Sequence, residues 1–380
     1  MTRIILSLFI FLITITSCSV TRNGISGKAV TIHSLKYLGE YIVPYNHQFK
    51  GTTVGGLSGI DYDAKQDVYY LICDDRSERN PARFYTAKIN IAPQGISIVE
   101  FVNVTTLLST SGNPYPDTKI EPANSPDPEA MRYNPILDQL IWTNEGERIV
   151  KKEITLQQPA ITIINKEGKY IDTFSLPAQI HNYETEKGLR RNSSFEGLTF
   201  ADNYKTMFVS VEEPLYEDGP RAALQDAAVY TRIIKYDMVS HKPVAQYAYH
   251  LSPVAHPAKP VTEFMINGIP DILSIDKNKL LVVERSFSTG VSACTIRVYI
   301  TDLTNATNIA DIQSLILQPP AYPESKRLLI NMDELGIYID NIEGVTFGPD
   351  LPNGHKTLIF VSDNNFAKEQ KTQFLLFEVN

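Results

Sequence analysis

The chain reads Glu196-Gly197-Leu198-Thr199-Phe200 at one point and Glu343-Gly344-Val345-Thr346-Phe347 at another, two copies of a segment that occurs five times. The other copies are Ser58-Gly59-Ile60-Asp61-Tyr62, Glu129-Ala130-Met131-Arg132-Tyr133 and Asp271-Ile272-Leu273-Ser274-Ile275. Successive copies begin 71, 67, 75 and 72 residues apart. A repeat of this period indicates an array of equal structural units rather than two or three unrelated domains.

Each copy precedes a polar turn and a second apolar run that ends on an acidic residue. These second runs are Val68–Asp74, Gln139–Glu145, Thr206–Glu212, Lys279–Glu284 and Thr357–Asp363. Further apolar runs follow, so each unit is predicted to hold up to four antiparallel strands. The fourth strand is least clear in the fourth unit, where Ile309–Leu317 is the candidate.

The predicted fold is therefore all-β, a β-propeller of five four-stranded blades. The last unit ends after its third strand, and Leu35–Val43 near the N-terminus offers the missing one. Pairing these two pieces would close the ring without leaving an open sheet edge between blades. Five units of about 71 residues account for nearly all of the 363 residues after residue 17. A six-bladed ring is the alternative, and would need a blade hidden in the long connections.

The N-terminus resembles a bacterial lipoprotein leader. Arg3 precedes an apolar run from Ile4 to Ile15, which is too short to span a bilayer, and Thr16-Ser17-Cys18 follows. We expect residues 1–17 to be a signal peptide, Cys18 to be lipidated, 18–34 to be a tether and 35–380 to form a single propeller domain. The protein would then be exported and membrane-anchored in the cell envelope, in the periplasm or at the outer membrane. An ordinary secretory signal is the alternative.

The composition excludes other classes of protein. A content of 43% hydrophobic residues rules out disorder as the main state, and a net charge of −8 argues against a nucleic-acid partner. We expect a monomer. Besides Cys18 only Cys73 and Cys294 remain, and they could pair in an exported protein. Their places on well-separated blades favour two buried free thiols.

Acidic residues recur where each predicted hairpin begins and ends. In an antiparallel hairpin the first residue of one strand lies beside the last residue of the next. If the first strand of each blade is innermost, ten such positions meet at one mouth of the channel. Nine of the ten are acidic, namely Asp74, Glu129, Glu145, Glu196, Glu212, Asp271, Glu284, Glu343 and Asp363, and the tenth is Ser58. Carboxylates in this number suit a hard cation, most simply Ca²⁺, which takes six to eight oxygen ligands.

Two other interpretations of the mouth stay open. The acids could be solvated, or paired with the nearby Arg76, Arg148, Arg191 and Arg285, because structural ion-pair networks also gather acids. Ser58 could suggest a nucleophile, but Gly55-Gly56-Leu57-Ser58-Gly59 lacks the spacing of a nucleophile elbow, so we interpret it as a hydrogen-bonding residue.

Several motifs together resemble the phytase-like family, which is described by an esterase-like activity of phytase. They are Gly56–Asp63 with Asp74-Asp75-Arg76 and Arg83-Phe84-Tyr85, Pro126–Ala130, Arg191–Leu198, Glu284-Arg285-Ser286 with Ile296–Tyr299, and Asp340–Pro349 with Ser362–Phe366. The resemblance covers nearly all of the chain after the leader. It implies a relation to calcium-dependent propeller phytases, which cleave phosphate monoesters and have six blades.

The resemblance implies a metal-dependent hydrolase that acts on a small anionic ester, a phosphate ester above all. The first-choice metal ligands or bases would then be Glu129, Glu196, Asp271, Glu343 and Asp363, of which Glu196 and Glu343 are expected to be catalytic. Arg76, Arg191 and Arg285 would bind the anionic substrate. Lysine is scarce around the mouth, so a small ester, a nucleotide or a diester is as suitable as phytate. Two rival functions remain: a calcium-dependent lactonase or carboxylesterase, and a non-enzymatic binding lipoprotein of the cell envelope.

Overall fold

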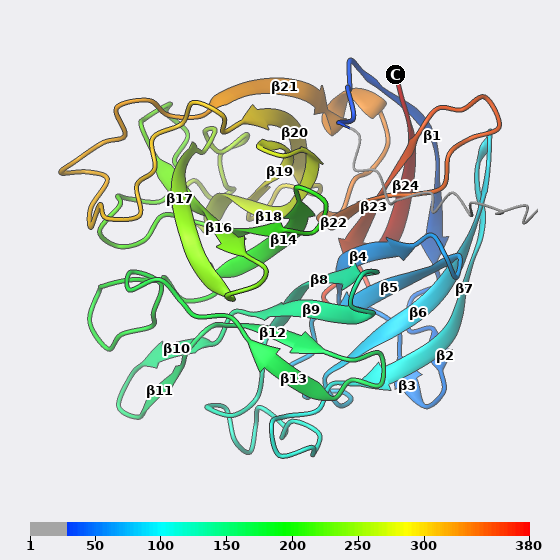
Figure 1. Cartoon of the computed structure of the whole chain (residues 1–380), viewed down its shortest axis with the longest axis horizontal. Helices are drawn as coiled ribbons and strands as arrows, with labels where there is room; N and C mark the ends of the chain where they lie inside the picture. The colour runs from blue at the N-terminus through cyan, green and yellow to red at the C-terminus, as the bar shows by residue number, and fades with distance from the viewer. Residues whose placement is uncertain (1–28) are drawn as a thin grey trace, which may run out of the picture.

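The computed structural model describes residues 29–380, and in them five four-stranded antiparallel sheets form a propeller (Figure 1). Blade 1 contains β4 (Leu57–Asp63), β5 (Val68–Cys73), β6 (Arg83–Ala92) and β7 (Gly95–Thr106), from the inside outward. Blade 2 contains β8 (Pro128–Asn134), β9 (Gln139–Asn144), β12 (Ala160–Ile164) and β13 (Tyr170–Thr173). Blade 3 contains β14 (Phe195–Ala201), β15 (Thr206–Val211), β16 (Tyr230–Asp237) and β17 (Lys242–His250).

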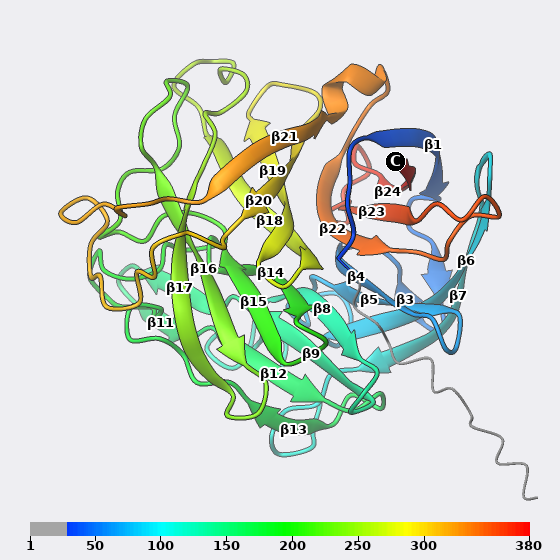
Figure 2. The same cartoon turned by 45° about the horizontal axis from the view of Figure 1, so that its top comes forward.

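Blade 4 contains β18 (Met265–Asp276), β19 (Lys279–Ser288), β20 (Thr295–Asp302) and β21 (Ser325–Asn331). Blade 5 contains β22 (Asn341–Phe347), β23 (Thr357–Asp363) and β24 (Thr372–Val379), and its outer strand is β1 (Leu35–Val43). β1 runs antiparallel to β24, from Leu35 opposite Val379 to Val43 opposite Thr372, and Figure 2 shows the two strands side by side. The predicted five-bladed ring and its closure by the N-terminal strand are confirmed.

Smaller elements decorate the ring. The hairpin β10 (Glu147–Val150) and β11 (Ile154–Gln157) is inserted between β9 and β12 of blade 2. A short hairpin of β2 (Gln48–Phe49) and β3 (Thr52–Thr53) precedes blade 1, and a 3₁₀ turn, η1 (Met332–Leu335), follows β21. Nowhere between residues 29 and 380 is there a helix long and apolar enough to cross a membrane. The predicted leader and the lipidation site Cys18 lie outside the described residues.

The cores of the propeller lie between the blades. In β5 the side chains of Tyr69, Leu71 and Cys73 pack toward blade 5, whereas Tyr70 and Ile72 pack toward blade 2. This is the alternation of a strand that is buried on both faces, which explains why β5 is apolar throughout. One such core fills each of the five interfaces. The innermost strands touch one another in turn around the ring, so their first residues gather at one mouth.

One strand prediction is wrong. The fourth strand of blade 4 is β21, and Ile309–Leu317 lies in the long connection before it. Ile309, Ile312 and Leu315 are nevertheless buried, because they pack on Ala248 of blade 3 in a small separate cluster. Their spacing of three residues does not fit the two-residue alternation of a half-buried strand. Apolar character alone marked this segment as a strand.

Cys73 and Cys294 are buried free thiols, as predicted. Each belongs to a different core between blades, which keeps them apart. Burial raises the pKa of the Cys294 thiol to about 11, so it stays protonated and unreactive at neutral pH.

Candidate metal centre and active site

A register shift near the start of every innermost strand aims the mouth residues. In blades 1, 2, 3 and 5 the shifted positions hold Ser58, Glu129, Glu196 and Glu343. A bulge of this kind leaves a residue unpaired and re-aims its side chain. In blade 4 the shift comes earlier, between Gly268 and Asp271, and Asp271 pairs regularly with Val283. Asp271 therefore differs structurally from the other repeated acids.

The mouth opens into a cavity of about 710 Å³. Five of the nine expected acids line it, namely Asp74, Glu129, Glu196, Glu212 and Glu343, and Asp340 and Glu369 join them. Arg285 is the basic residue of the lining within the described part of the chain. A cavity of this size suits a small organic ligand, for which volumes of about 300–1,000 Å³ are usual.

Two groups of three carboxylates could hold metal ions. The first contains Asp74, Asp127 and Glu129, and the second contains Glu129, Glu145 and Glu196. In each group one ligand oxygen per residue lies within 4.8 Å of the others. Oxygens on opposite sides of one Ca²⁺ lie about 5 Å apart, because Ca–O distances are about 2.3–2.6 Å. The oxygens are therefore close enough to share a cation, and Glu129 belongs to both groups.

These carboxyl groups are poorly suited to full ionisation without a cation. Burial, followed by the charges of neighbouring acids, raises the pKa values of Asp74, Glu129 and Glu196 well above their usual range. The same causes raise the pKa values of Glu145 and Glu343 to about 8. Either protons or a bound cation must compensate a site of this kind. Oxygen-only donors in a crowded acidic site fit Ca²⁺.

Arg285 links two of the acids at the mouth. Its Nη2 lies 2.6 Å from Glu212 Oε1, and its Nη1 lies 3.2 Å from Glu343 Oε1 and 2.6 Å from Asn341 Oδ1. The guanidinium thereby holds Glu212 of blade 3 and Glu343 of blade 5 at fixed positions. Arg285 is thus a basic partner of the mouth acids, as expected, and it is already bonded to three residues of the protein.

Arg76 and Arg191 meet at Glu147, the first residue of β10. Arg76 Nη1 lies 2.8 Å from Glu147 Oε2 and 3.4 Å from Asp127 Oδ2, and Arg191 Nε lies 2.9 Å from Glu147 Oε1. Although burial opposes it, the hydrogen bonds and charges of the two arginines lower the pKa of Glu147. Nε and Nη2 of Arg76 are buried and have no hydrogen-bond partner among the described residues. Those two buried donors are unsatisfied and lie beside the first group of carboxylates.

Arg148, another predicted partner of the mouth acids, turns away from them. It donates through Nε to the carbonyl of Tyr183 and lies over the ring of Tyr216. Arg148 thus ties the β10–β11 hairpin to a neighbouring loop.

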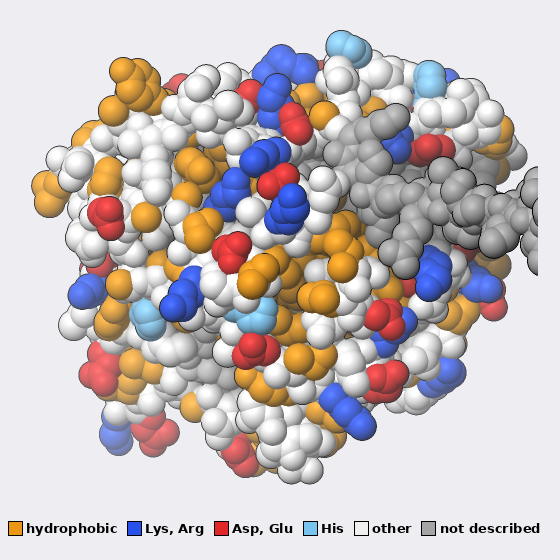
Figure 3. Space-filling model, in the orientation of Figure 1, with side chains coloured by type: hydrophobic (Ala, Val, Ile, Leu, Met, Phe, Trp, Pro, Cys, Tyr) orange, Lys and Arg blue, Asp and Glu red, His pale blue; other side chains and the backbone are white. Residues whose placement is uncertain are grey.

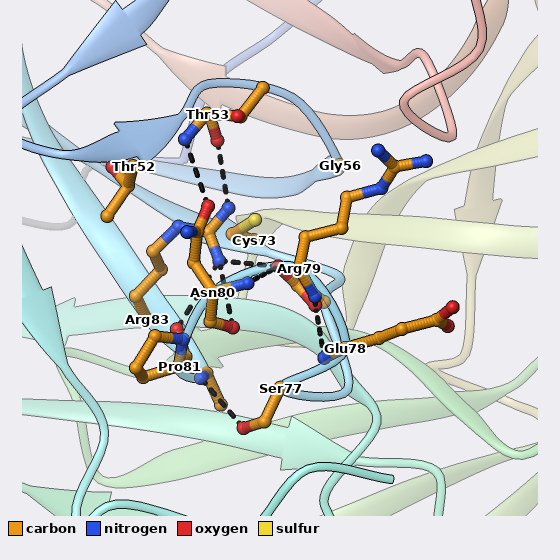
Figure 4. A network of polar contacts seen from close by, with 12 residues as sticks. Thr52, Thr53, Gly56, Cys73, Ser77, Glu78, Arg79, Asn80, Pro81 and Arg83 are labelled. Carbon is orange, nitrogen blue, oxygen red and sulfur yellow. Dashed lines mark hydrogen bonds and ion pairs between the residues drawn. The ribbon is translucent and has the colours of Figure 1, made fainter. Parts of the chain in front are cut away.

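The loop that carries Asp74 and Arg76 is held by a buried ion pair. Asp75 accepts hydrogen bonds from the backbone N–H groups of three residues, Glu78, Arg79 and Asn80, and lies 2.7 Å from Arg83 Nη1. Figure 4 shows Arg83 and Asn80 beside Thr53, where Arg83 Nη2 donates to the Thr53 carbonyl and Asn80 Oδ1 accepts from the Thr53 N–H. This network fixes the backbone that directly follows Asp74, a member of the first metal group.

Ser58 also supports the site through its backbone. Its Oγ donates to the carbonyl of Glu129, with an O···O distance of 2.6 Å, and its side chain is buried. The expected hydrogen-bonding role of this serine is confirmed, and the contact fixes Glu129 against the neighbouring blade.

Four of the nine expected acids do not line the mouth cavity, namely Glu145, Asp271, Glu284 and Asp363. Glu145 still belongs to the second metal group, whereas Asp271 and Glu284 have partners elsewhere. Asp271 is bound by Arg132, whose Nη2 lies 2.7 and 2.9 Å from its two carboxylate oxygens. Glu284 accepts hydrogen bonds from Tyr249 Oη and Asn267 Nδ2 at 2.8 and 2.9 Å and forms an ion pair with Lys326 of β21. The expectation that both would join a shared metal site at the mouth is corrected, because each already has a basic partner away from the cavity. Asp363 is buried near Glu343 and raises the pKa of that residue, but does not line the cavity.

Asp127 and Glu147 belong to the site although the hairpin rule does not select them. Asp127 stands two residues before Glu129, just outside β8, and reaches the first metal group from the loop. Its position in Pro126-Asp127-Pro128-Glu129 was a usable signal, because alternate residues of an extended segment face the same side. Glu147 lies on an inserted hairpin, which the repeat pattern does not predict.

Comparisons with known proteins give one result that defines the family. No curated protein matches the chain in sequence. The solved structures it resembles include the Dos1 propeller (TM-score 0.35, 8% identity, covering 87% of this chain and 69% of that one). They also include the gluconolactonase XC5397 of Xanthomonas campestris (0.34, 8%, 84% and 71%) and the hydrazine synthase of Kuenenia stuttgartiensis (0.33, 9%, 88% and 99%). At such scores and identities they support no inference about chemistry.

A family model matches residues 52–366, which is most of the chain and includes the mouth residues described above except Glu369. Its description is phytase-like, esterase-like activity of phytase. The match contains both carboxylate groups, Arg285 and the Asp75–Arg83 network. This protein therefore belongs to the phytase-like family.

Proposed function

We propose that this protein is a metal-dependent hydrolase, with Ca²⁺ as the simplest cation, that cleaves a phosphate ester at the carboxylate-lined mouth. The observation that carries the proposal is the pair of carboxylate groups joined by Glu129, set in a cavity large enough for a small ester. Asp74, Asp127, Glu129, Glu145 and Glu196 would hold the cations. A bound divalent cation would supply neutralisation of the phosphate oxygens and would lower the pKa of water.

The other residues of the mouth have separate tasks in this proposal. The free donors of Arg76 would bind a phosphate oxygen, and Arg191, which is half exposed, would attract the anion at the rim. Glu343, with a pKa of about 8, would take up or release a proton near neutral pH. Arg285 would keep Glu343 in place and compensate its charge.

We propose that the protein is exported, anchored to the membrane through a lipid at Cys18 and monomeric, with no nucleic-acid partner. On the face drawn in Figure 3, basic and acidic side chains are mixed rather than gathered into a basic stripe. Mass spectrometry of the mature N-terminus would test the lipid: an unmodified residue there would contradict the anchor.

The decisive experiment combines calorimetry with a substrate panel. Ca²⁺ should bind the wild-type protein and bind Glu196→Gln at least tenfold more weakly, while Glu100→Gln, an exposed acid on β7, should behave as wild type. Calcium-dependent hydrolysis should then appear with 4-nitrophenyl phosphate, a phosphodiester or phytate, and should fall at least 100-fold in Glu343→Gln. Hydrolysis of lactones or carboxylic esters alone would favour the lactonase alternative. Absence of both Ca²⁺ binding and turnover would favour a binding protein.

A further inference from the structure

We infer that part of the mouth cavity is a binding subsite for an apolar or aromatic group, so that the preferred substrate is an ester of an apolar alcohol carrying one phosphate. This inference rests on the proposed function for its chemistry, and adds the class of substrate. It comes from the composition of the cavity wall. Besides carboxylates, the wall contains Phe287, Val291, Ala293, Cys294 and Tyr338.

The apolar residues follow directly from Arg285 along blade 4. Arg285 and Phe287 are two residues apart on β19, so their side chains project from the same face of the strand. Arg285 reaches the acids Glu212 and Glu343, and Phe287 lies two positions further along, where the strand leads into the Ser288–Thr295 turn. A ligand whose phosphate lies near the carboxylates can therefore extend over Phe287.

Phe287 is partly exposed in the cavity wall. It is 37% exposed, and its ring centroid lies 6.3 Å from that of Phe264, which is 50% exposed. Aromatic rings left in contact with water near a polar site are typical of surfaces that cover a ligand. Phe287 lines the cavity, and Phe264 packs beside it outside the lining.

Hydrogen bonds hold this wall in place without a ligand. The Val291 N–H donates to the Ser288 carbonyl at 3.0 Å, which closes the turn between β19 and β20. The Thr289 N–H donates to the Phe264 carbonyl at 2.9 Å, and the Lys259 N–H donates to the Thr289 carbonyl at 2.8 Å. The turn is thereby joined to the loop that carries Phe264. A preformed apolar wall binds its ligand at a smaller entropic cost than a mobile one.

The charges of the cavity argue against a heavily phosphorylated substrate. Seven acids and one arginine line it, and no lysine does so within the described residues. That arginine, Arg285, is already bonded to Glu212, Glu343 and Asn341. Two divalent cations would neutralise only four of the seven acidic charges, so the cavity stays acidic and every additional phosphate on a substrate adds repulsion. An ester with a single phosphate and an apolar remainder uses both parts of the wall.

The test rests on 3-phenylpropyl phosphate and propyl phosphate, both esters of simple primary alcohols of similar acidity, so that their chemical reactivity is matched. For the calcium-loaded full-length protein we expect kcat/KM for 3-phenylpropyl phosphate to exceed that for propyl phosphate and glycerol 2-phosphate by at least tenfold, and that for phytate by more. Phe287→Ala and Val291→Ser should raise KM for the phenylpropyl ester at least fivefold and leave propyl phosphate unchanged. The control Leu137→Ala, an exposed apolar residue in the β8–β9 turn, should change neither value.

The outcomes separate the subsite from the proposed function. Calcium-dependent turnover in which phytate or glycerol phosphate is the better substrate would overturn the subsite and leave the proposed function in place. If no ester is cleaved, calorimetry with 3-phenylpropylphosphonate and propylphosphonate decides. Tighter binding of the phenyl compound that is lost in Phe287→Ala would support the subsite, although the proposed hydrolysis would have failed. Equal binding of the two phosphonates would overturn the subsite. Thermal melts establish that each variant is folded.

Discussion

Arg132 and Asp271 form an ion pair at the axis of the propeller, with Nη2 2.7 and 2.9 Å from the two carboxylate oxygens. Arg132 also donates to the carbonyls of Ile60, Ile272 and Val345, which belong to the innermost strands of blades 1, 4 and 5. Both side chains are at most 2% exposed. One arginine of blade 2 thus joins three other blades at the centre of the ring.

Breaking the Arg132–Asp271 pair should destabilise the fold without removing the metal site. Asp271→Ala leaves a buried guanidinium uncompensated, which typically costs about 3–5 kcal/mol. We expect this loss in urea unfolding, with Ca²⁺ affinity within twofold of wild type. The double variant Arg132→Met/Asp271→Leu should recover most of the loss, because it removes both buried charges. Normal stability combined with lost Ca²⁺ binding in Asp271→Asn would instead make Asp271 a ligand.

Glu129 should matter more for metal binding than any other single carboxylate, because it belongs to both groups. Glu129→Gln should weaken all Ca²⁺ binding at least tenfold, whereas Asp74→Asn and Glu145→Gln should each impair one group. Calorimetric stoichiometry distinguishes these patterns, with Glu100→Gln as the matched surface control. Identical stoichiometry in all three site variants would contradict two adjacent ions.

The metal-free protein should lose stability as pH rises. Glu145 and Glu343 have pKa values of about 8 in the folded protein, chiefly because of burial, against about 4.3 for an unfolded glutamate. Between these values the folded state holds protons that the unfolded state has released, so each group lowers the free energy of unfolding by up to about 1.4 kcal/mol per pH unit. The contribution is complete below about pH 4 and is lost as pH rises to about 8.

Calcium should reverse this trend, because it replaces those protons. Urea unfolding at pH 5, 6.5 and 8 in chelator should show decreasing stability, while the stabilisation added by Ca²⁺ should grow over the same range. The double variant Glu145→Gln/Glu343→Gln should flatten the metal-free slope. A metal-free protein more stable at pH 8 than at pH 5 would show that the mouth acids are already compensated.

The Asp75–Arg83 ion pair should hold Asp74 in position for metal binding, although neither residue of the pair belongs to a metal group. Arg83→Met leaves Asp75 buried without its partner, and we expect a loss of about 3–5 kcal/mol in stability together with weaker Ca²⁺ binding, since Asp74 is adjacent. Faster proteolysis within residues 74–82 would report the loosened loop. Lys119→Ala is the matched control, because it removes an exposed pair with Glu78 on the same loop and should cost at most about 1 kcal/mol. Unchanged Ca²⁺ affinity in a folded Arg83→Met protein would limit the pair to a structural role.

Much of the fold followed from the sequence, because strand and turn patterns act over short distances. The repeat of about 71 residues, the hairpin within each unit and the spare strand Leu35–Val43 predicted a five-bladed ring closed at its N-terminus, and the ring is present. The same local rule placed Asp74, Glu129, Glu196, Glu212 and Glu343 at one mouth, and all five line the cavity. Each of these predictions depends only on alternation along one strand or on pairing between neighbours in one blade.

Only the tertiary structure decided which acids are free to serve a site. Asp271 and Glu284 satisfy the same local pattern, but the register shift in blade 4 comes earlier, and Arg132 of blade 2 and Lys326 of β21 bind their carboxylates. Asp127 belongs to the first metal group because the loop before β8 places it beside Glu129. The partner of a buried charge is chosen by packing between blades, through contacts up to 139 residues apart, which the alternation of a single strand does not encode.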